Sequence, residues 1–411
     1  MTSSYLNFRN SIPWLILLLE ALFLTGFYFL NSTADERFPV PDIYPEFQDV
    51  NHMVIFGFGF FLMVLRRYGF SSTGFNLLII VLGVQYSVLV EDLVFFFMEA
   101  HEGVLRSLAK AVISLTAVVI STGAVLGKTN LLQLIVMTLV ELIAFRVSRW
   151  INREFMEVQE HDLSLMHVHL FGAYFGLAVA FCFPEPSPRL DKNRSTPKSD
   201  LLSMLGCVFL WVFWPSFNSL LAGFKTRAVL NTYFALAVSA VSAFMLSALT
   251  TKDGKFRVTH IHSAILAGGV SVSYTAQTIT HPWIAMILGL LGSVITILGS
   301  HCVQRCLNPP LKIHDTLGVH FTFGLPAVLG AFAQVVLLVI KQWTNSQSSY
   351  SLDYLVLIHV GAFCQTISFA LISGFITGLI LNTKLLKIIP VSKYFEDQFY
   401  WEVSFHVKLT V

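Results

Sequence analysis

Apolar runs long enough to cross a lipid bilayer recur along the whole of this 411-residue chain. A membrane-spanning helix needs ~20 mostly apolar residues, and there are about twelve such runs, or about eleven if two weak ones merge. They lie near residues 13–30, 54–65, 75–97, 104–126, 131–145, 163–183, 201–221, 228–249, 260–276, 283–298, 317–340 and 355–381. Helices of this length satisfy their own backbone hydrogen bonds inside lipid. The pattern predicts an all-α polytopic membrane protein.

The composition supports this class and argues against others. Hydrophobic residues make up 55% of the chain and charged residues only 12%, with a mean hydropathy of +0.70. A soluble protein has about 25% charged residues, so one large soluble core is a poor alternative. The net charge of +2 is too small to indicate a nucleic-acid partner.

Lys and Arg are unevenly shared between the two sides that the runs alternately face. One side receives most of them, including those in 189–198, 252–257 and 384–393. The other side receives fewer, along with the acidic segment 35–49. Basic residues in short loops favour the cytoplasm, so both termini are predicted to be cytoplasmic.

We expect a single membrane domain over residues 1–411 made of two halves, 1–184 and 200–384, with a cytoplasmic tail at 385–411. The loop between the halves, 184–199, is rich in Pro, Ser and charge and is typical of a hinge. Asn31-Ser32-Thr33 is an N-glycosylation sequon in the first loop on the non-cytoplasmic side.

Two histidines sit inside apolar runs, where an ionisable side chain is costly and usually functional. His169 shares a helix face with Gly172 and Gly176, the small-residue spacing that lets membrane helices pack closely. His169 is therefore predicted to point into the protein. His167 lies roughly 200° around the helix axis from it and is predicted to point away.

A second stretch repeats this design near the C-terminus. His320 shares a face with Gly324, Ala327 and Ala331. The central hypothesis is one site built from two similar halves, with His169 and His320 hydrogen-bonded across a narrow apolar lumen.

Trp214-Pro215-Ser216-Phe217-Asn218 is the next most distinctive stretch inside an apolar run. A proline followed by polar residues is predicted to open the helix backbone, which is tolerated where it lines a cavity. Phe217 and Asn218 are thus candidate pore-lining residues. Ordinary aromatic packing is the alternative for Phe217.

Other polar residues in or near the runs are assigned structural roles. His260, His262, His314 and Asp315 are placed at helix entrances, where water at the membrane interface accounts for them, and His359 is predicted to be a hydrogen-bonded core residue. Buried acids need hydrogen-bond partners; these are Glu20, Glu91, Asp92 and Glu141.

The two pore histidines do not fit a metal site or an enzyme. Neither face carries a carboxylate or thiol that would complete a zinc site, and no nucleophile motif flanks them. No cofactor is indicated. An apolar lumen favours uncharged imidazoles, each able to donate or accept one hydrogen bond. Such a pair would guide a small polar molecule and reject hydrated ions. Neutral ammonia, formed by deprotonation at the entrance, is one hypothesis, but the composition alone does not single it out.

Several motifs occur in the order found in one known family. They are GAVLGK at 123–128, FGAYFGL at 171–177, WPSFNS at 214–219, LAGG at 266–269 and HDTLGVH at 314–320. Together they resemble the Rhesus (Rh) branch of the ammonium transporter superfamily over essentially the whole chain. LEA at 19–21 and KYFEDQ at 393–398 look most like the Rh blood group polypeptides of vertebrate red cells.

This resemblance implies a plasma-membrane trimer of twelve-span subunits, each with its own pore and an inverted repeat. It makes His169 and His320 the twin pore histidines and Phe217 the inner aromatic gate. The implied partners are ammonia or ammonium, a Rh-associated glycoprotein in a homo- or heterotrimer, and the ankyrin-based membrane skeleton of the erythrocyte.

Two positions depart from the family pattern. Family transporters carry an acid about two turns before the first pore histidine; here that offset holds His161, with Glu160 and Asp162 beside it as candidate acids. The outer aromatic gate falls on or near Ile113, an aliphatic residue. The leading function is a channel for ammonia or ammonium, with carbon dioxide as a further candidate substrate. The alternative is a non-conducting structural subunit of a red-cell membrane complex.

Overall fold

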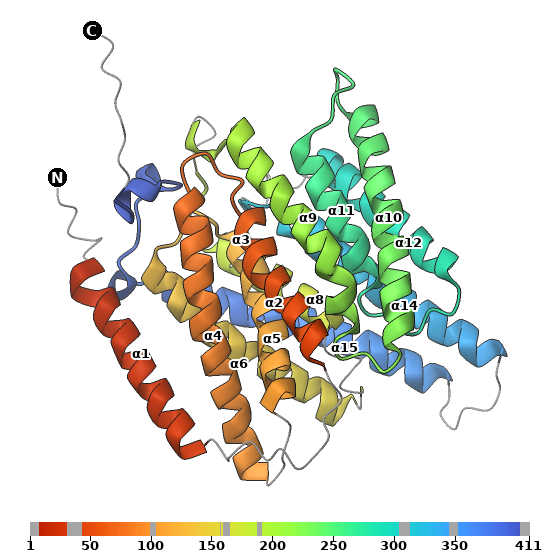
Figure 1. The fold of residues 1–411 in the computed structure, drawn as a ribbon, viewed down its shortest axis with the longest axis horizontal. Helices are drawn as coiled ribbons and strands as arrows, with labels where there is room; N and C mark the ends of the chain where they lie inside the picture. Colours follow the sequence, from red (N-terminus) through yellow and green to blue (C-terminus); the bar gives the residue numbers. More distant parts are fainter. Residues whose placement is uncertain are drawn as a thin grey trace.

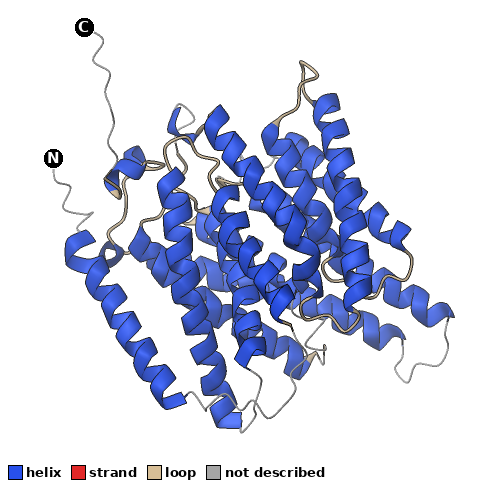
Figure 2. Cartoon of the chain, viewed as in Figure 1, coloured by secondary structure: helices blue, strands red, loops and turns tan. Residues whose placement is uncertain are grey.

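The structure is a computed structural model that describes residues 8–30, 43–98, 104–156, 158, 165–186, 191–303, 313–344 and 352–402. In this described part every regular element is helical, as Figure 2 shows. The long helices lie side by side in one bundle (Figure 1). The predicted all-α membrane fold is confirmed.

The helices follow the predicted runs closely. In the first half they are α1 (Phe8–Leu30), α2 (Tyr44–His52), the π-helical turn η2 (Met53–Gly57), α3 (Phe58–Phe61), α4 (Gly69–Met98), α5 (Val104–Ala124), α6 (Leu131–Phe155) and α8 (Leu165–Phe181). In the second half they are α9 (Pro197–Ser219), α10 (Lys225–Thr250), α11 (Val258–Val272), α12 (Pro282–Leu298), the π-turns η4 (Gly299–Val303) and η5 (His320–Gly324), α14 (Leu325–Thr344) and α15 (Leu352–Leu381).

Within the described residues, 9 of these helical segments are long and apolar enough to cross a membrane, and α8 and α11 are shorter apolar helices. The predicted run 54–65 instead corresponds to the composite segment from α2 to α3. Hydropathy misplaced its start because α2, with sequence YPEFQDVNH, is largely polar.

Glycines allow the backbone of α8 to approach the backbones of two neighbouring helices closely. A Cβ on Gly172 would lie 2.4 Å from the Ala117 carbonyl oxygen of α5, and one on Gly176 would lie 2.7 Å from Ser121 Cα. Gly374 of α15 makes the equivalent approach to the Phe175 carbonyl oxygen on another side of α8. The predicted small-residue contact is therefore confirmed, and it extends to two neighbouring helices.

The second half contains a similar contact. A Cβ on Gly330 of α14 would lie 2.6 Å from the Ser271 carbonyl oxygen of α11. The helix that carries His169 and the helix that follows His320 are thus each packed through glycine against an earlier helix, α8 against α5 and α14 against α11.

Three of the four acids predicted to lie within or near the apolar runs have polar partners in the described part of the chain. Glu20 accepts a hydrogen bond from the Gln85 amide at 3.0 Å, and Glu141 accepts one from the Ser121 hydroxyl at 2.5 Å. Glu91 forms ion pairs with Lys110 and Arg146. Structural roles are supported for these three acids.

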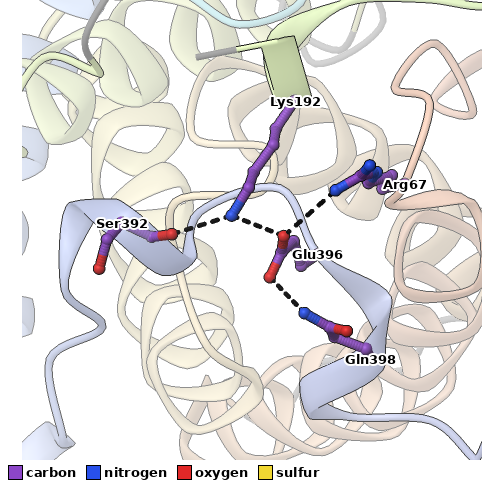
Figure 3. A network of polar contacts seen from close by, with 5 residues as sticks. All are labelled: Arg67, Lys192, Ser392, Glu396 and Gln398. Carbon is purple, nitrogen blue, oxygen red and sulfur yellow. Dashed lines mark hydrogen bonds and ion pairs between the residues drawn. The ribbon is translucent and has the colours of Figure 1, made fainter.

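A segment after α15, residues 384–402, is fastened across one end of the bundle. Glu396 pairs with Lys192 at 2.5 Å and with Arg67 at 3.6 Å, and Lys192 also donates to the Ser392 carbonyl (Figure 3). Asp397 accepts the backbone N–H groups of Phe70 and Ser71 at the start of α4. The C-terminal segment therefore joins a loop of the first half to the linker between the halves.

Candidate substrate pathway

His169 is fully buried within a cluster of aromatic rings. Its imidazole stacks on Trp214, with ring centroids 5.7 Å apart, and on Phe323 at 6.2 Å. Phe217 lies 5.8 Å away in a tilted arrangement. All four side chains have 0% exposure. The rings come from α8, α9 and η5, so both halves of the chain build this site.

Neither ring nitrogen of His169 has a hydrogen-bond partner among the described residues. A polar group buried without a partner is costly, and most such groups in native proteins have one. The predicted hydrogen bond between His169 and His320 is therefore wrong. His169 instead presents two free nitrogens to aromatic surfaces.

His320 does not contact the ring of His169. Its ring meets the edges of Tyr174 and Phe321, at 5.9 and 5.0 Å, and is only half-buried. Its backbone N–H donates to Asp315 at 3.0 Å. The twin-histidine arrangement predicted from the sequence is not formed.

The backbone of η5 explains this difference. A π-turn contains more residues per turn than an α-helix, so faces counted with an α-helical period shift along it. His320–Gly324 is such a turn. Phe323, rather than His320, is consequently the residue that faces His169.

Phe217 lies beside His169, so the structure brings these two predicted residues together. Asn218 follows Phe217 in the sequence. Its amide nitrogen donates to the Thr232 hydroxyl at 3.0 Å and to the Gly269 carbonyl at 3.2 Å, and its Oδ1 has no partner among the described residues. α9 continues through Pro215 to Ser219. Because proline has no backbone N–H, one helical hydrogen bond is missing at Pro215, and a wider opening of the backbone stays a prediction.

Further aromatic rings close the cluster on the side of the composite first-half segment. Phe58 and Phe61 lie 6.1 and 6.4 Å from Phe323, and Phe61 also meets the edge of His262 at 5.1 Å. Sequence reasoning missed Phe58, Phe61 and Phe323. No local signal separates them from the other phenylalanines of the chain, because apolar residues are expected at every position of a buried membrane helix.

His167 is buried and hydrogen-bonded, so the prediction that it points away is wrong. Its Nδ1 lies 2.5 Å from the Thr366 hydroxyl, which also accepts the Asn152 amide at 3.0 Å. The physical reason is that α8 is covered by α15 as well as by α5. His359 lies 2.7 Å from the Tyr274 hydroxyl, which confirms the predicted hydrogen bond, but its side chain is only partly buried rather than in the core.

Ile113 is 1% exposed within α5. Glu160, Asp162 and the sequon residue Asn31 lie outside the described residues. Within the described ranges, no group of three or more His, Cys, Asp or Glu side chains could hold a metal ion.

The fold and the buried histidine site define a helical membrane protein of the channel and transporter class. The family model of the ammonium transporter family matches residues 14–399. Relatives over 98% of both chains include an RH-like protein of Macaca mulatta, at 40% identity, and the blood group Rh(CE) polypeptide of Homo sapiens, at 39%. The chain therefore belongs to the ammonium transporter family, and its predicted Rh resemblance is confirmed.

Solved structures agree with this assignment. Rh50 of Nitrosomonas europaea, from the Rhesus protein family of channels, matches with a TM-score of 0.77 and 28% identity, over 87% of this chain and 91% of that one. A sensor Amt protein matches with a TM-score of 0.69 and 19% identity, over 85% of this chain and 94% of that one. The second likeness concerns the fold alone.

Proposed function

We propose that this chain is an Rh-type membrane subunit whose own pathway for ammonia is closed around His169, so that it acts as a structural partner in a membrane assembly. The observation that carries the proposal is the complete burial of His169 by Trp214, Phe217 and Phe323. A molecule as large as ammonia needs these rings to separate. Because the phenyl ring of Phe323 faces His169, an ammonia molecule at this site would also meet only one imidazole.

The family relationship extends this proposal to the surroundings of the chain. We place it in the plasma membrane with both termini cytoplasmic, as a single domain of two halves followed by the tail 385–411. The assembly is a trimer with copies of itself or with a Rh-associated glycoprotein, attached through ankyrin to the membrane skeleton. We also propose that Asn31 is glycosylated and that the carboxylates of Glu160 and Asp162 lie at the entrance of the pathway.

A second candidate is conduction of neutral ammonia past His169, with Phe217 as the inner gate and Ile113 near the outer one. The unpartnered nitrogens of His169 favour it, because a passing molecule that donates or accepts a hydrogen bond would satisfy them. Carbon dioxide, which is small and uncharged, is tested alongside ammonia.

Stopped-flow measurements on the purified full chain in liposomes separate the two. A pH-sensitive dye inside the vesicles reports ammonia entry, and empty vesicles set the background. We expect the unmodified chain to match the background. Phe323→His is expected to raise the rate, because it places a second imidazole against His169 and shortens the apolar barrier.

Phe323→Leu is the matched control, since it removes the ring but adds no polar group, and it is expected to stay at background. A rate above background for the unmodified chain that is lost in His169→Leu would contradict the closed pathway and establish the second candidate. Carbon dioxide entry in the same vesicles is expected to remain at background.

A further inference from the structure

A cavity of about 380 Å³ opens at the end of the bundle that carries the C-terminal segment. It lies between the first turn of α11, the end of α12 with η4, and the loop that leads into η5. Arg257, His260 and Ser263 line one side, and His301, Thr316 and Thr322 line the others. Its volume falls within the range of small-molecule sites. The residues that close the pathway around His169 do not line it.

Three buried polar atoms at this cavity have no hydrogen-bond partner among the described residues. They are His260 Nδ1, Thr316 Oγ1 and Thr322 Oγ1. His260 is 7% exposed and Thr322 is 1% exposed. We predicted from the sequence that interfacial water accounts for His260, but the side chain is buried. The residues that carry these atoms line the cavity, and buried polar groups in native proteins usually have a partner. The lining therefore fits a polar ligand.

The start of α11 adds backbone donors to the same space. The first N–H groups of a helix lack the carbonyl partner that later ones find one turn earlier. At α11 the N–H groups of His260 and Ile261 donate to the Arg257 carbonyl, so the backbone donors are those of Val258 and Thr259. The helix dipole also makes this end attractive to anions. Arg257 is the N-cap residue and makes no side-chain cap hydrogen bond. The cavity is lined by Arg257, Thr259 and His260 from this end of α11.

The charges around the cavity favour an anion. Arg257 contributes a guanidinium group, and the exposed Lys252 and Lys255 precede it in the α10–α11 loop, drawn at the upper end of the bundle in Figure 1. Asp315 also lines the cavity, but both of its carboxylate oxygens accept backbone N–H groups, from Gly318 at 2.9 Å and from His320 at 3.0 Å. These bonds engage both carboxylate oxygens, while the negative charge itself remains beside the cavity.

We propose that this cavity is a phosphate-binding site, with Arg257, His260 and the α11 N-terminus as the main ligands and Thr316 and Thr322 as further hydrogen-bonding groups. A phosphate group offers enough acceptor oxygens for several donors at once, and its bonds to a guanidinium are strong. The volume accommodates the group and part of the molecule that carries it. The carrier is either a soluble phosphate compound or the headgroup of an anionic lipid.

Two measurements on the full chain distinguish these sources. In the first, inorganic phosphate is titrated into the chain in phosphatidylcholine nanodiscs, and the melting temperature is followed by tryptophan fluorescence, since a ligand that binds the folded state raises it. In the second, native mass spectrometry counts the phosphatidic acid molecules that the chain retains. Saturable binding of either probe is the expected result.

Arg257→Gln is expected to weaken that binding by about tenfold, because it removes a charge-assisted hydrogen bond. Thr322→Val, which is nearly isosteric and safe for folding, is expected to weaken it less. Lys255→Gln is the matched control: it removes the same charge from the same loop but does not line the cavity. No binding of either probe, or an equal loss in Lys255→Gln and Arg257→Gln, would overturn the proposal.

Discussion

Lys128 holds an amino group in a place where its charge is costly. It is 1% exposed in the loop between α5 and α6, and its Nζ donates to the His314 carbonyl at 2.5 Å. Burial lowers the pKa of Lys128 to about 7, although Asp315 opposes this shift. Burial, and then the charge of Lys128, lower the pKa of His314 to about 4, so that its Nε2 stays free to accept the Asn193 amide at 2.9 Å.

The lowered pKa of Lys128 makes the free energy of unfolding depend on pH. Between about pH 7 and the ordinary pKa of 10.5, the unfolded chain holds a proton on Lys128 that the folded chain has released. The free energy of unfolding therefore rises with pH across this window. We expect the melting temperature in detergent to rise from pH 7 to pH 9, and to rise less in Lys128→Met. Parallel pH curves for the two proteins would contradict the assignment.

At the scale of the helix, the packing of α8 depends on two glycines, which have no side chain. Gly172 and Gly176 bring its backbone against α5, where β-carbons would collide with main-chain atoms of Ala117 and Ser121. Main-chain atoms inside a helix have little freedom to move aside. The close packing of α8 against α5 therefore depends on these two glycines.

Gly172→Ala is expected to lower the stability of the protein by about 1–3 kcal/mol through overpacking. The measurement is the temperature at which half of the detergent-solubilised protein loses its size-exclusion peak. Gly361→Ala in α15 is the control, because its nearest neighbour is the flexible Met156 side chain, with Sδ at 3.4 Å. Equal melting temperatures for the two variants would show that α8 and α5 can separate at little cost.

At the scale of the whole molecule, the C-terminal segment connects parts that are distant in sequence. Glu396 binds Arg67 from the α3–α4 loop and Lys192 from the linker between the halves, while Phe395 donates its backbone N–H to the Gly127 carbonyl. The segment thus holds loops of the first half against the linker.

Asp397→Asn is expected to loosen this segment, because it weakens two hydrogen bonds at the positive end of α4, at a cost of about 1 kcal/mol. Chymotrypsin digestion of the full chain in detergent measures the effect through faster cleavage near Phe399 and Tyr400. Asp253→Asn, in the exposed α10–α11 loop, serves as the control. If cleavage after Asp397→Asn is as slow as in the control, the carboxylate does not fasten the segment.

The sequence alone determined the class of the protein, most of the helices and the inward orientation of His169. These follow from local properties: the length of each apolar run, the spacing of small residues, and the cost of a polar group in lipid. The order of motifs along the chain also identified the family.

Only the tertiary structure decided which residue faces His169. The choice of Phe323 over His320 depends on a π-turn that the residue pattern does not encode, because an apolar stretch has the same composition with either helical period. The same holds for the cavity at the start of α11 and for the ion pairs of Glu396 with Arg67 and Lys192. Each brings together residues that are far apart in the chain, and their proximity is fixed by how whole helices pack.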